Sequence, residues 1–334
     1  MVLAPMAGYT DSAFRMLCKN YGADIVMTEL ISADSIYHNK KLHISHPESS
    51  EGSRDSSLAV QNDNISELLK IDKTLSLAKF QEKERPIVVQ LFGKYPEKFA
   101  IAAKWIVENL KPDGIDINMG CPARKVVGSD HGAALLKNPD LAVEIVKAVR
   151  EQIDIPLSVK TRLGWEADDE ILEFAPKLIE AGADALIIHG RTYKDGFKNK
   201  ARWENIYEVK SQIANRKLQT SIIGNGDIQS YDDAIEKSES NGIKLDGVAI
   251  GRATFGKPYI FQDTSNKKQD TNIKELISDH AKLCYETKGE HGIIEFRKHL
   301  LAYLKGFPNA KELRLKAVNI ETVADVENIV NKIS

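Results

Sequence analysis

The sequence predicts an α/β fold, a TIM (β/α)8 barrel followed by a small all-helical domain, and two observations predict it. First, eight short apolar runs end in small or polar residues, and most are followed by a stretch with helical apolar spacing. Strands that are apolar throughout indicate a parallel sheet covered on both faces, and eight repeats fit a closed barrel better than an open sheet. Second, 334 residues leave room for one barrel of about 250 residues plus an appendage.

The expected strands are residues 2–5, 25–28, 87–91, 114–118, 157–160, 185–189, 220–224 and 247–250. Amphipathic spacing predicts helices that include residues 96–109, 140–152, 168–181 and 231–241. The barrel is expected to span residues 1–262, with a serine-rich insertion at about 44–66 whose composition is unsuited to a packed core. After a polar linker at 264–271 the pattern is wholly helical, so residues 271–334 are expected to form the second domain.

Composition excludes several classes of protein. With 46 Lys and Arg against 48 Asp and Glu the net charge is -2, which excludes a broadly basic nucleic-acid coat but allows a local basic patch. Three scattered cysteines are too few for a disulfide framework or a clustered metal motif, and no metal site is expected. No long apolar run or signal peptide is evident, so a cytoplasmic protein without membrane contact is expected, and nothing indicates an obligate protein partner.

One local basic patch is present in the predicted helical domain. Residues 297–316 carry six basic side chains against one acid and are interleaved with Tyr303 and Phe307. Charge runs are usually solvated faces, but basic and aromatic side chains together are also typical of RNA contact. Arg297 and Lys298 are the candidate RNA-binding residues of this segment.

Polar residues gather where the predicted strands end, which is where TIM barrels carry their active sites. In chain order they are Pro5-Met6-Ala7-Gly8, Gln90, Asn118 with Gly120-Cys121-Pro122, Lys160 and Arg162, His189 and Arg191, Asn225-Gly226-Asp227, and Gly251-Arg252. Burying cationic side chains, an amide and a thiol together would be costly for stability alone. This clustering therefore predicts a functional site.

The residue types indicate a phosphate-bearing, electron-rich ligand. Glycines after the last two strands let backbone N–H groups approach an anion, at the position where barrels commonly hold a phosphate. Lys160 and His189 can donate to an electron-rich ring edge such as that of a reduced flavin, and Gln90 offers both a donor and an acceptor. Cys121 lies between glycine and proline in a loop facing the site, and an ordinary thiol holds its proton at neutral pH and can act as an acid.

Eight sequence strings, taken in order, are similar to those of one enzyme family. APMAGYTD, VVQLFG, DINMGCPARKV, GAALL, SVKTRLGW, HGRT, IGNGDI and GVAIGRA cover nearly the whole barrel. The chain resembles the tRNA-dihydrouridine synthases, most of all the bacterial B-type members, and its helical tail with Arg297-Lys298-His299 resembles their RNA-binding domain.

The resemblance implies an FMN enzyme that takes a hydride from NADPH and reduces the C5–C6 double bond of particular uridines in tRNA. Flavin N5 would deliver hydride to C6, and Cys121 would protonate C5 as the catalytic residue. The implied cofactor-binding residues are Pro5, Met6, Ala7, Gln90, Lys160, His189, Asn225, Gly226, Asp227, Gly251 and Arg252. The implied substrate-binding residues are Asn118, Arg124, Arg162, Arg191, Arg297 and Lys298.

Two further interpretations stay open at this stage. A small-molecule flavin barrel such as a dihydroorotate dehydrogenase would perform related chemistry, but it would have no need of the basic tail. A non-catalytic RNA-binding protein would not need Cys121 or the complete cofactor set. The chain also departs from the family pattern at Asn199 and Arg202, where the family usually has a glycine and an acid.

Overall fold

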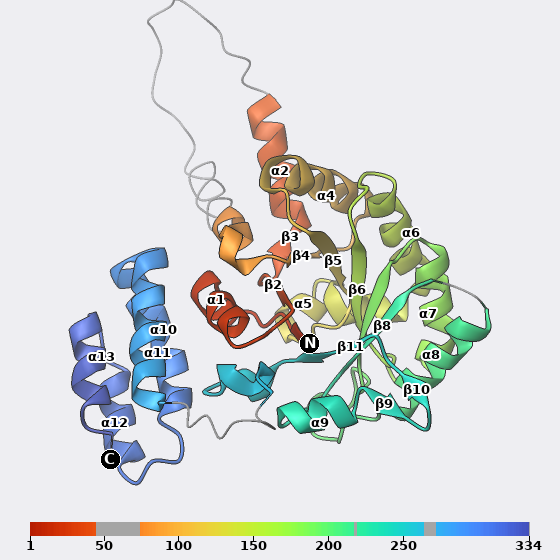
Figure 1. The fold of residues 1–334 in the computed structure, drawn as a ribbon. Coiled ribbons are helices and arrows are strands. Elements are labelled where there is room, and N and C mark those ends of the chain that lie inside the picture. Colours follow the sequence, from red (N-terminus) through yellow and green to blue (C-terminus); the bar gives the residue numbers. More distant parts are fainter. Residues whose placement is uncertain (45–73, 217–218, 264–271, 334) are drawn as a thin grey trace, which may run out of the picture.

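A computed structural model describes residues 1–44, 74–216, 219–263 and 272–333 (Figure 1). Parallel strands form a central barrel with helices around it, and a separate group of helices lies beside the N-terminal part of the barrel. Apart from residue 44, the expected serine-rich insertion at about 44–66 lies outside the described residues, as does the linker at 264–271. No helix among the described residues has the length and apolar character needed to cross a bilayer.

Eight parallel strands close the barrel, which confirms the predicted fold class. They are β1 (Val2–Leu3), β2 (Ile25–Met27), β4 (Ile87–Phe92), β5 (Gly114–Asn118), β6 (Leu157–Arg162), β7 (Ala185–His189), β8 (Ser221–Asn225) and β11 (Gly247–Ile250). Closure comes from β1, which pairs with both β2 and β11, and from β2, which pairs with β4. The short strand β3 (Ile31–Ser32), which the apolar pattern did not predict, extends the sheet beside β4.

Side-chain alternation along the strands separates two apolar layers. One layer packs between the strands and the surrounding helices. The other is a small, separate cluster formed by Val2, Ala4, Met27, Ile187, Ile223 and Ala249. Because successive strand residues point to opposite faces, this cluster fills the inside of the barrel. Further along the same strands the inward positions become polar, which places the polar residues at one end of the barrel.

The described helices around the barrel are α1 (Ser12–Asn20), α2 (Ala33–Ile44), α4 (Pro96–Leu110), α5 (Arg124–Val127), α6 (Pro139–Arg150), α7 (Glu170–Glu180), α8 (Glu204–Asn215) and α9 (Tyr231–Glu236). The helix expected at 231–241 was too long, because α9 ends at Glu236. A hairpin of β9 (Glu239–Ser240) and β10 (Ile243–Lys244) follows it. Asn241 and Gly242 turn this hairpin with φ of 52° and 76°, and an Asn-Gly pair favours such a turn.

The described residues after the barrel form four helices: α10 (Ile273–Lys288), α11 (Glu290–Tyr303), α12 (Ala310–Ala317) and α13 (Val323–Val330). The first two, α10 and α11, pack against α1 through aromatic rings. The Phe14 ring stacks on His299 at 4.7 Å and on His280 at 5.6 Å between ring centroids. The His280 Nδ1 lies 2.9 Å from the Tyr303 hydroxyl, and burial holds the pKa of both histidines well below the ordinary value. Both imidazole rings are therefore neutral, and they stack on Phe14 as uncharged rings.

A buried ion pair ties α1 to the segment that precedes β4. The Arg15 guanidinium contacts the Glu84 carboxylate at 2.5 Å, and both side chains are almost fully buried. Arg15 also donates to the Thr10 and Lys79 carbonyls, while Ser12 donates to Glu84. A buried ion pair with all its hydrogen bonds made is sensitive to the loss of one partner, because the other charge is left unpaired.

We expect Glu84→Ala to lower the free energy of unfolding by about 3–5 kcal/mol, because it leaves the buried Arg15 charge without its negative counter-charge. The matched control is Glu82→Ala, whose carboxylate is 82% exposed and pairs with Arg85 on the surface. That change is expected to cost only about 0–1 kcal/mol. Urea unfolding monitored by circular dichroism measures both, and equal effects of the two variants would contradict this account of Arg15.

Candidate active site

A cavity of about 530 Å³ opens at the C-terminal ends of the barrel strands. Every residue expected to hold a cofactor lines it: Pro5, Met6, Ala7, Gln90, Lys160, His189, Asn225, Gly226, Asp227, Gly251 and Arg252. The expected catalytic residue Cys121 and two of the expected substrate residues, Asn118 and Arg162, line the same cavity. The structure thus brings together in one space side chains from seven different strand ends.

A chain of hydrogen bonds positions the Cys121 loop. The buried Asp116 carboxylate accepts from Gln90 Nε2 at 2.7 Å, and Gln90 Oε1 accepts from Asn118 Nδ2 at 3.0 Å. Asn118 Oδ1 in turn accepts from the Cys121 backbone N–H at 3.0 Å. In its ionised form the Asp116 carboxylate only accepts, so it sets the orientation of the Gln90 amide and, through it, that of Asn118. The placement of Cys121 therefore begins at Asp116.

Sequence reasoning missed Asp116, although its position contained a signal. It lies two residues before Asn118 on β5, so both side chains point into the barrel. Burial raises the pKa of Asp116 to about 7, against the opposing effect of hydrogen bonds from Ser158 and Gln90 and of the Lys160 charge. Buried carboxyl groups whose pKa is shifted to near 7 are often found at functional sites.

Lys160 lies in the floor of the cavity with little compensation for its charge. Its Nζ donates to Asn225 Oδ1 at 3.1 Å, and Asn225 Nδ2 donates to the Ala249 carbonyl at 2.7 Å. Burial and the nearby Arg162 lower the pKa of Lys160 to about 8. The ammonium group therefore lacks a full counter-charge in the protein, and an electron-rich ligand beside it would stabilise the protonated form.

His189 is a neutral hydrogen-bond acceptor. Burial lowers its pKa well below the ordinary value, and the neighbouring cations Arg162, Lys160 and Arg191 lower it further. Arg191 Nη1 lies 3.2 Å from His189 Nε2, so the arginine donates and the imidazole accepts. His189 can therefore donate toward the cavity only through Nδ1, a narrower role than the sequence predicts.

Two neighbouring strand ends form the anion-binding end of the cavity. Asn225-Gly226-Asp227 follows β8, and Gly251-Arg252 follows its partner β11. Gly226 has φ of 131°, and a Cβ atom there would lie 2.7 Å from the Ala201 Cβ, so only glycine fits. Among the described residues the lining holds one acid, Asp227, which is engaged by Arg191 at 2.6 Å and lies 3.7 Å from Arg252, so the three lining cations Lys160, Arg162 and Arg252 outnumber it. This donor set fits a phosphate-bearing cofactor.

The remaining expected substrate residues are placed differently. Arg124 is exposed at the start of α5, directly after the Cys121 loop, where it can meet a large substrate. Arg191 lies behind the cavity lining, because its guanidinium is engaged by the Asn199 carbonyl, His189 and Asp227. With these contacts made inside the protein, Arg191 supports Asp227, and it is a weaker candidate for a substrate contact than the sequence predicts.

Arg297 and Lys298 are likewise engaged within the protein. Arg297 donates to the Ile320 carbonyl at 2.9 and 2.6 Å, and thereby ties α11 to the segment between α12 and α13. Lys298 Nζ lies 3.8 Å from the Asp11 carboxylate and 5.7 Å from the centre of the Tyr9 ring, at the junction with the barrel. These tertiary partners, which sequence cannot show, make both residues poor candidates for phosphate contact.

Phe197 also lines the cavity and was not singled out by the sequence. It follows β7 in a long loop, and 52% of its surface is exposed. Its ring lies 4.3 Å from the Arg252 guanidinium carbon and 5.7 Å from that of Arg162. A phenylalanine within a polar loop has no periodic signal, so only the structure reveals its position.

The three cysteines should differ in reactivity. Cys121 is partly exposed in the cavity, whereas Cys18 and Cys284 are buried and burial raises the pKa of both thiols. We expect iodoacetamide to modify Cys121 at least about tenfold faster than either buried thiol, because the thiolate is the reactive form and must be accessible. Peptide mapping by mass spectrometry after native labelling measures the three rates, and fast labelling of Cys18 or Cys284 would contradict this placement.

Comparison with known proteins identifies the family of this chain. The family model described as dihydrouridine synthase (Dus) matches residues 2–334. A probable tRNA-dihydrouridine synthase of Aquifex aeolicus is 34% identical, over 98% of this chain and 93% of the relative. The tRNA-dihydrouridine synthase B of Vibrio vulnificus is 34% identical, over 94% of this chain and 89% of the relative. Among solved structures, a mandelate oxidase mutant with an FMN adduct aligns with 98% of this chain and 77% of its own at 15% identity, with a TM-score of 0.43, too distant to bear on function. The chain belongs to the dihydrouridine synthase family of flavin-dependent oxidoreductases.

Proposed function

We propose that this protein is a tRNA-dihydrouridine synthase that binds FMN, takes reducing equivalents from NADPH and reduces the C5–C6 double bond of uridines in tRNA. One observation supports this most strongly: a single cavity holds both an anion-binding end and the partly exposed Cys121 thiol. Membership in the family and the names of the relatives support the substrate class.

The cavity residues divide into groups suited to different parts of FMN. The backbone at Gly226 and Gly251, with the Arg252 guanidinium, would hold the phosphate. Lys160 would face the electron-rich edge of the ring system, where its charge stabilises developing negative charge. FMN, when bound, supplies the hydride that is added at C6 of the uracil. Pro5, Met6 and Ala7 would bound the ring from β1.

Cys121 is proposed as the proton donor to C5 of the uracil. Its thiol lines the cavity, and its backbone is fixed by Asn118 through the N–H and by Ala133, which donates to the Cys121 carbonyl at 3.1 Å. Arg162 fixes the preceding residue by donating to the Gly120 carbonyl at 2.7 Å. A target base reaches this cavity only when it leaves its stack, which favours uridines in loops.

The helices α10–α13 are proposed to contact tRNA, with the barrel at residues 1–262 as the catalytic domain. Because Arg297 and Lys298 are engaged internally, the contact is assigned instead to exposed basic residues further along the chain. Lys305, Lys311 and Arg314 are exposed, whereas Lys316 is paired with Glu312 at 2.5 Å. These side chains can neutralise phosphates without breaking a contact inside the protein.

Removal of the proton donor tests the proposed reaction. We expect Cys121→Ala to retain bound flavin and its reduction by NADPH but to slow uridine reduction by about 10²- to 10⁴-fold, because general acid catalysis contributes about that factor. Single-turnover mixing of reduced enzyme with tRNA lacking dihydrouridine measures this step. Cys18→Ala, remote from the cavity, is the control and should react like the unsubstituted protein. Undiminished turnover by Cys121→Ala would remove the role assigned to its thiol.

The tail is tested by the salt dependence of tRNA binding. Replacing Lys305, Lys311 and Arg314 together by alanine should weaken binding and flatten the slope of log K against log salt by about 0.7–0.9 per lost phosphate contact. The control replaces Lys104, Lys147 and Lys177, three exposed lysines on the outer helices α4, α6 and α7. Equal slopes for the two triple variants, measured by filter binding, would exclude this surface as a tRNA contact.

A further inference from the structure

The loop that joins β7 to α8, residues 190–203, forms part of the cavity wall and is here called the mouth loop. Phe197 lies on it and lines the cavity. Its base is fixed by backbone contacts, because the Arg202 N–H donates to the Gly190 carbonyl at 2.6 Å. Beside the base, Trp203 Nε1 donates to the Gly226 carbonyl at 3.2 Å. These contacts hold the two ends of the loop and leave the position of its centre to other groups.

The first half of the mouth loop is held by the loop after β6. The Tyr193 ring stacks on Trp165 at 3.9 Å between centroids, and the Tyr193 N–H donates to the Gly164 carbonyl at 2.9 Å. An ion pair between Lys194 and Glu166 joins the same two loops on the surface. All these contacts precede Phe197, so they do not hold the chain after it.

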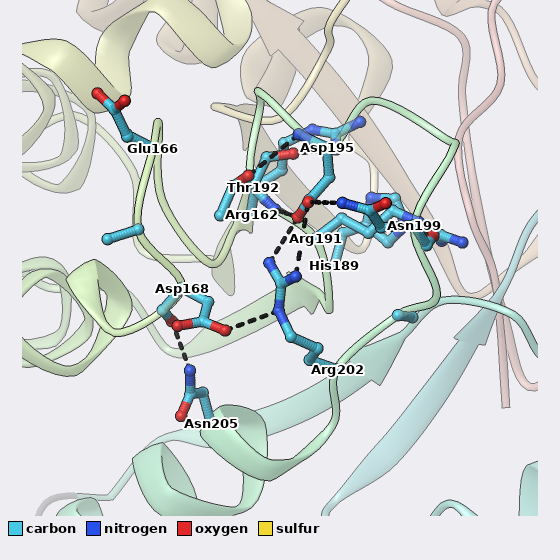
Figure 2. A network of polar contacts seen from close by, with 12 residues as sticks. Arg162, Glu166, Asp168, His189, Arg191, Thr192, Asp195, Asn199, Arg202 and Asn205 are labelled. Carbon is cyan, nitrogen blue, oxygen red and sulfur yellow. Dashed lines mark hydrogen bonds and ion pairs between the residues drawn. The ribbon is translucent and has the colours of Figure 1, made fainter.

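Arg202 forms the contact that holds the second half. Its Nη2 contacts Asp195 Oδ2 at 2.5 Å, and its Nε lies 2.7 Å from Asp168 Oδ2 in the loop after β6 (Figure 2). The Nε contact is an ion pair without an aligned hydrogen bond, so its strength is electrostatic. The Asp168 carbonyl also accepts from Asn205 Nδ2 at 2.7 Å, which joins the start of α8 to the same point.

Asp195 connects this ion cluster to the tip of the mouth loop. It accepts from the Thr192 N–H at 2.8 Å and from Asn199 Nδ2. Partial burial acts to raise the pKa of Asp195, but the hydrogen bonds from Thr192, Asn199 and Arg202 outweigh it and hold the pKa well below its usual range. The carboxylate is therefore charged at neutral pH, and it spans the chain on both sides of Phe197.

Phe197 contributes a phenyl ring to the cavity wall, and about half of the surface of this residue is exposed. Two guanidinium groups, those of Arg252 and Arg162, lie near the ring, and His189 lies 6.3 Å away between ring centroids. An exposed apolar ring at the opening of a cationic cavity favours a planar aromatic ligand, because stacking removes apolar surface from water. A nucleobase is such a ligand.

We propose that Arg202 is a positioning residue that holds Asp195 and Asp168 together, and so fixes Phe197 as a stacking wall for the incoming nucleobase. This inference rests on the proposed function for the identity of the base. The fixing of the loop stands on the geometry alone. Arg202 acts through the mouth loop and does not itself line the cavity.

Limited proteolysis of the holoenzyme tests the loop without reference to activity. Lys198 and Lys200 are exposed in the mouth loop and offer trypsin sites. Arg202→Ala and Asp168→Ala should each raise cleavage after these lysines by about tenfold or more, since cleavage follows the population of the open loop. The double variant should be cleaved no faster than Arg202→Ala, because one interaction is lost in both. Glu166→Ala, which removes the surface ion pair between the same two loops, is the matched control and should resemble the unsubstituted protein.

Steady-state kinetics with NADPH and tRNA tests the consequence for the substrate. Arg202→Ala should raise KM for tRNA by about tenfold with kcat changed by less than about threefold, because lost positioning affects binding more than the chemical step. Phe197→Ala should reproduce the rise in KM without faster cleavage after Lys200, and Phe197→Tyr should restore it. Arg202→Lys should give intermediate values, because an ammonium group spans two carboxylates less well than a guanidinium group.

Two results would overturn the inference. Cleavage in Arg202→Ala at the rate of the unsubstituted protein would show that the ion cluster does not fix the loop. Faster cleavage with an unchanged KM, or an unchanged KM in Phe197→Ala, would show that the loop position does not serve the substrate. Failure of the unsubstituted holoenzyme to reduce tRNA would instead remove the proposed function and with it the nucleobase, while the cleavage rates would still decide the role of Arg202.

Discussion

The geometry of the candidate active site depends on one chain of buried hydrogen bonds, from Asp116 through Gln90 and Asn118 to the backbone of Cys121. Each group orients the next one. The ionised Asp116 carboxylate only accepts, so the Gln90 amide must turn its nitrogen toward it. The Gln90 oxygen then accepts from the Asn118 amide nitrogen, which fixes the orientation of Asn118. The thiol is thereby held at the cavity by residues on two neighbouring strands.

The barrel makes this chain possible through the period of its strands. Inward positions are apolar near the strand starts, where Val2, Ile187 and Ile223 fill the interior. Two residues further along β7 and β8 the inward positions become polar, at His189 and Asn225. Burial disfavours the charged forms of the ionisable groups at this end of the barrel. It raises the pKa of Asp116 to about 7 and lowers the pKa of Lys160 to about 8. The two-residue alternation of side chains along the strands thus provides both the apolar interior of the barrel and the polar site at its end.

Most of the residues that line the cavity could be predicted from the sequence, for a physical reason. Strand ends in a parallel barrel converge, so a list of polar residues at strand ends is also a list of neighbours, and the cavity lining matches it closely. The sequence could not show which cations are already paired. Arg191, Arg297 and Lys298 read as free basic residues, yet their partners Asp227, Ile320 and Asp11 lie far away in the chain. Phe197 was missed because a loop side chain has no period, and its position depends on ion pairs between loops.

The central claim is that this cavity passes reducing equivalents to a uridine in tRNA, and an anaerobic titration tests it most directly. The holoenzyme is reduced with NADPH, and the return of oxidised flavin absorbance is followed after addition of tRNA lacking dihydrouridine, with orotate in a parallel cell. The account predicts reoxidation by tRNA and none by orotate. Reoxidation by orotate alone, or a protein that cannot be reconstituted with FMN, would contradict it.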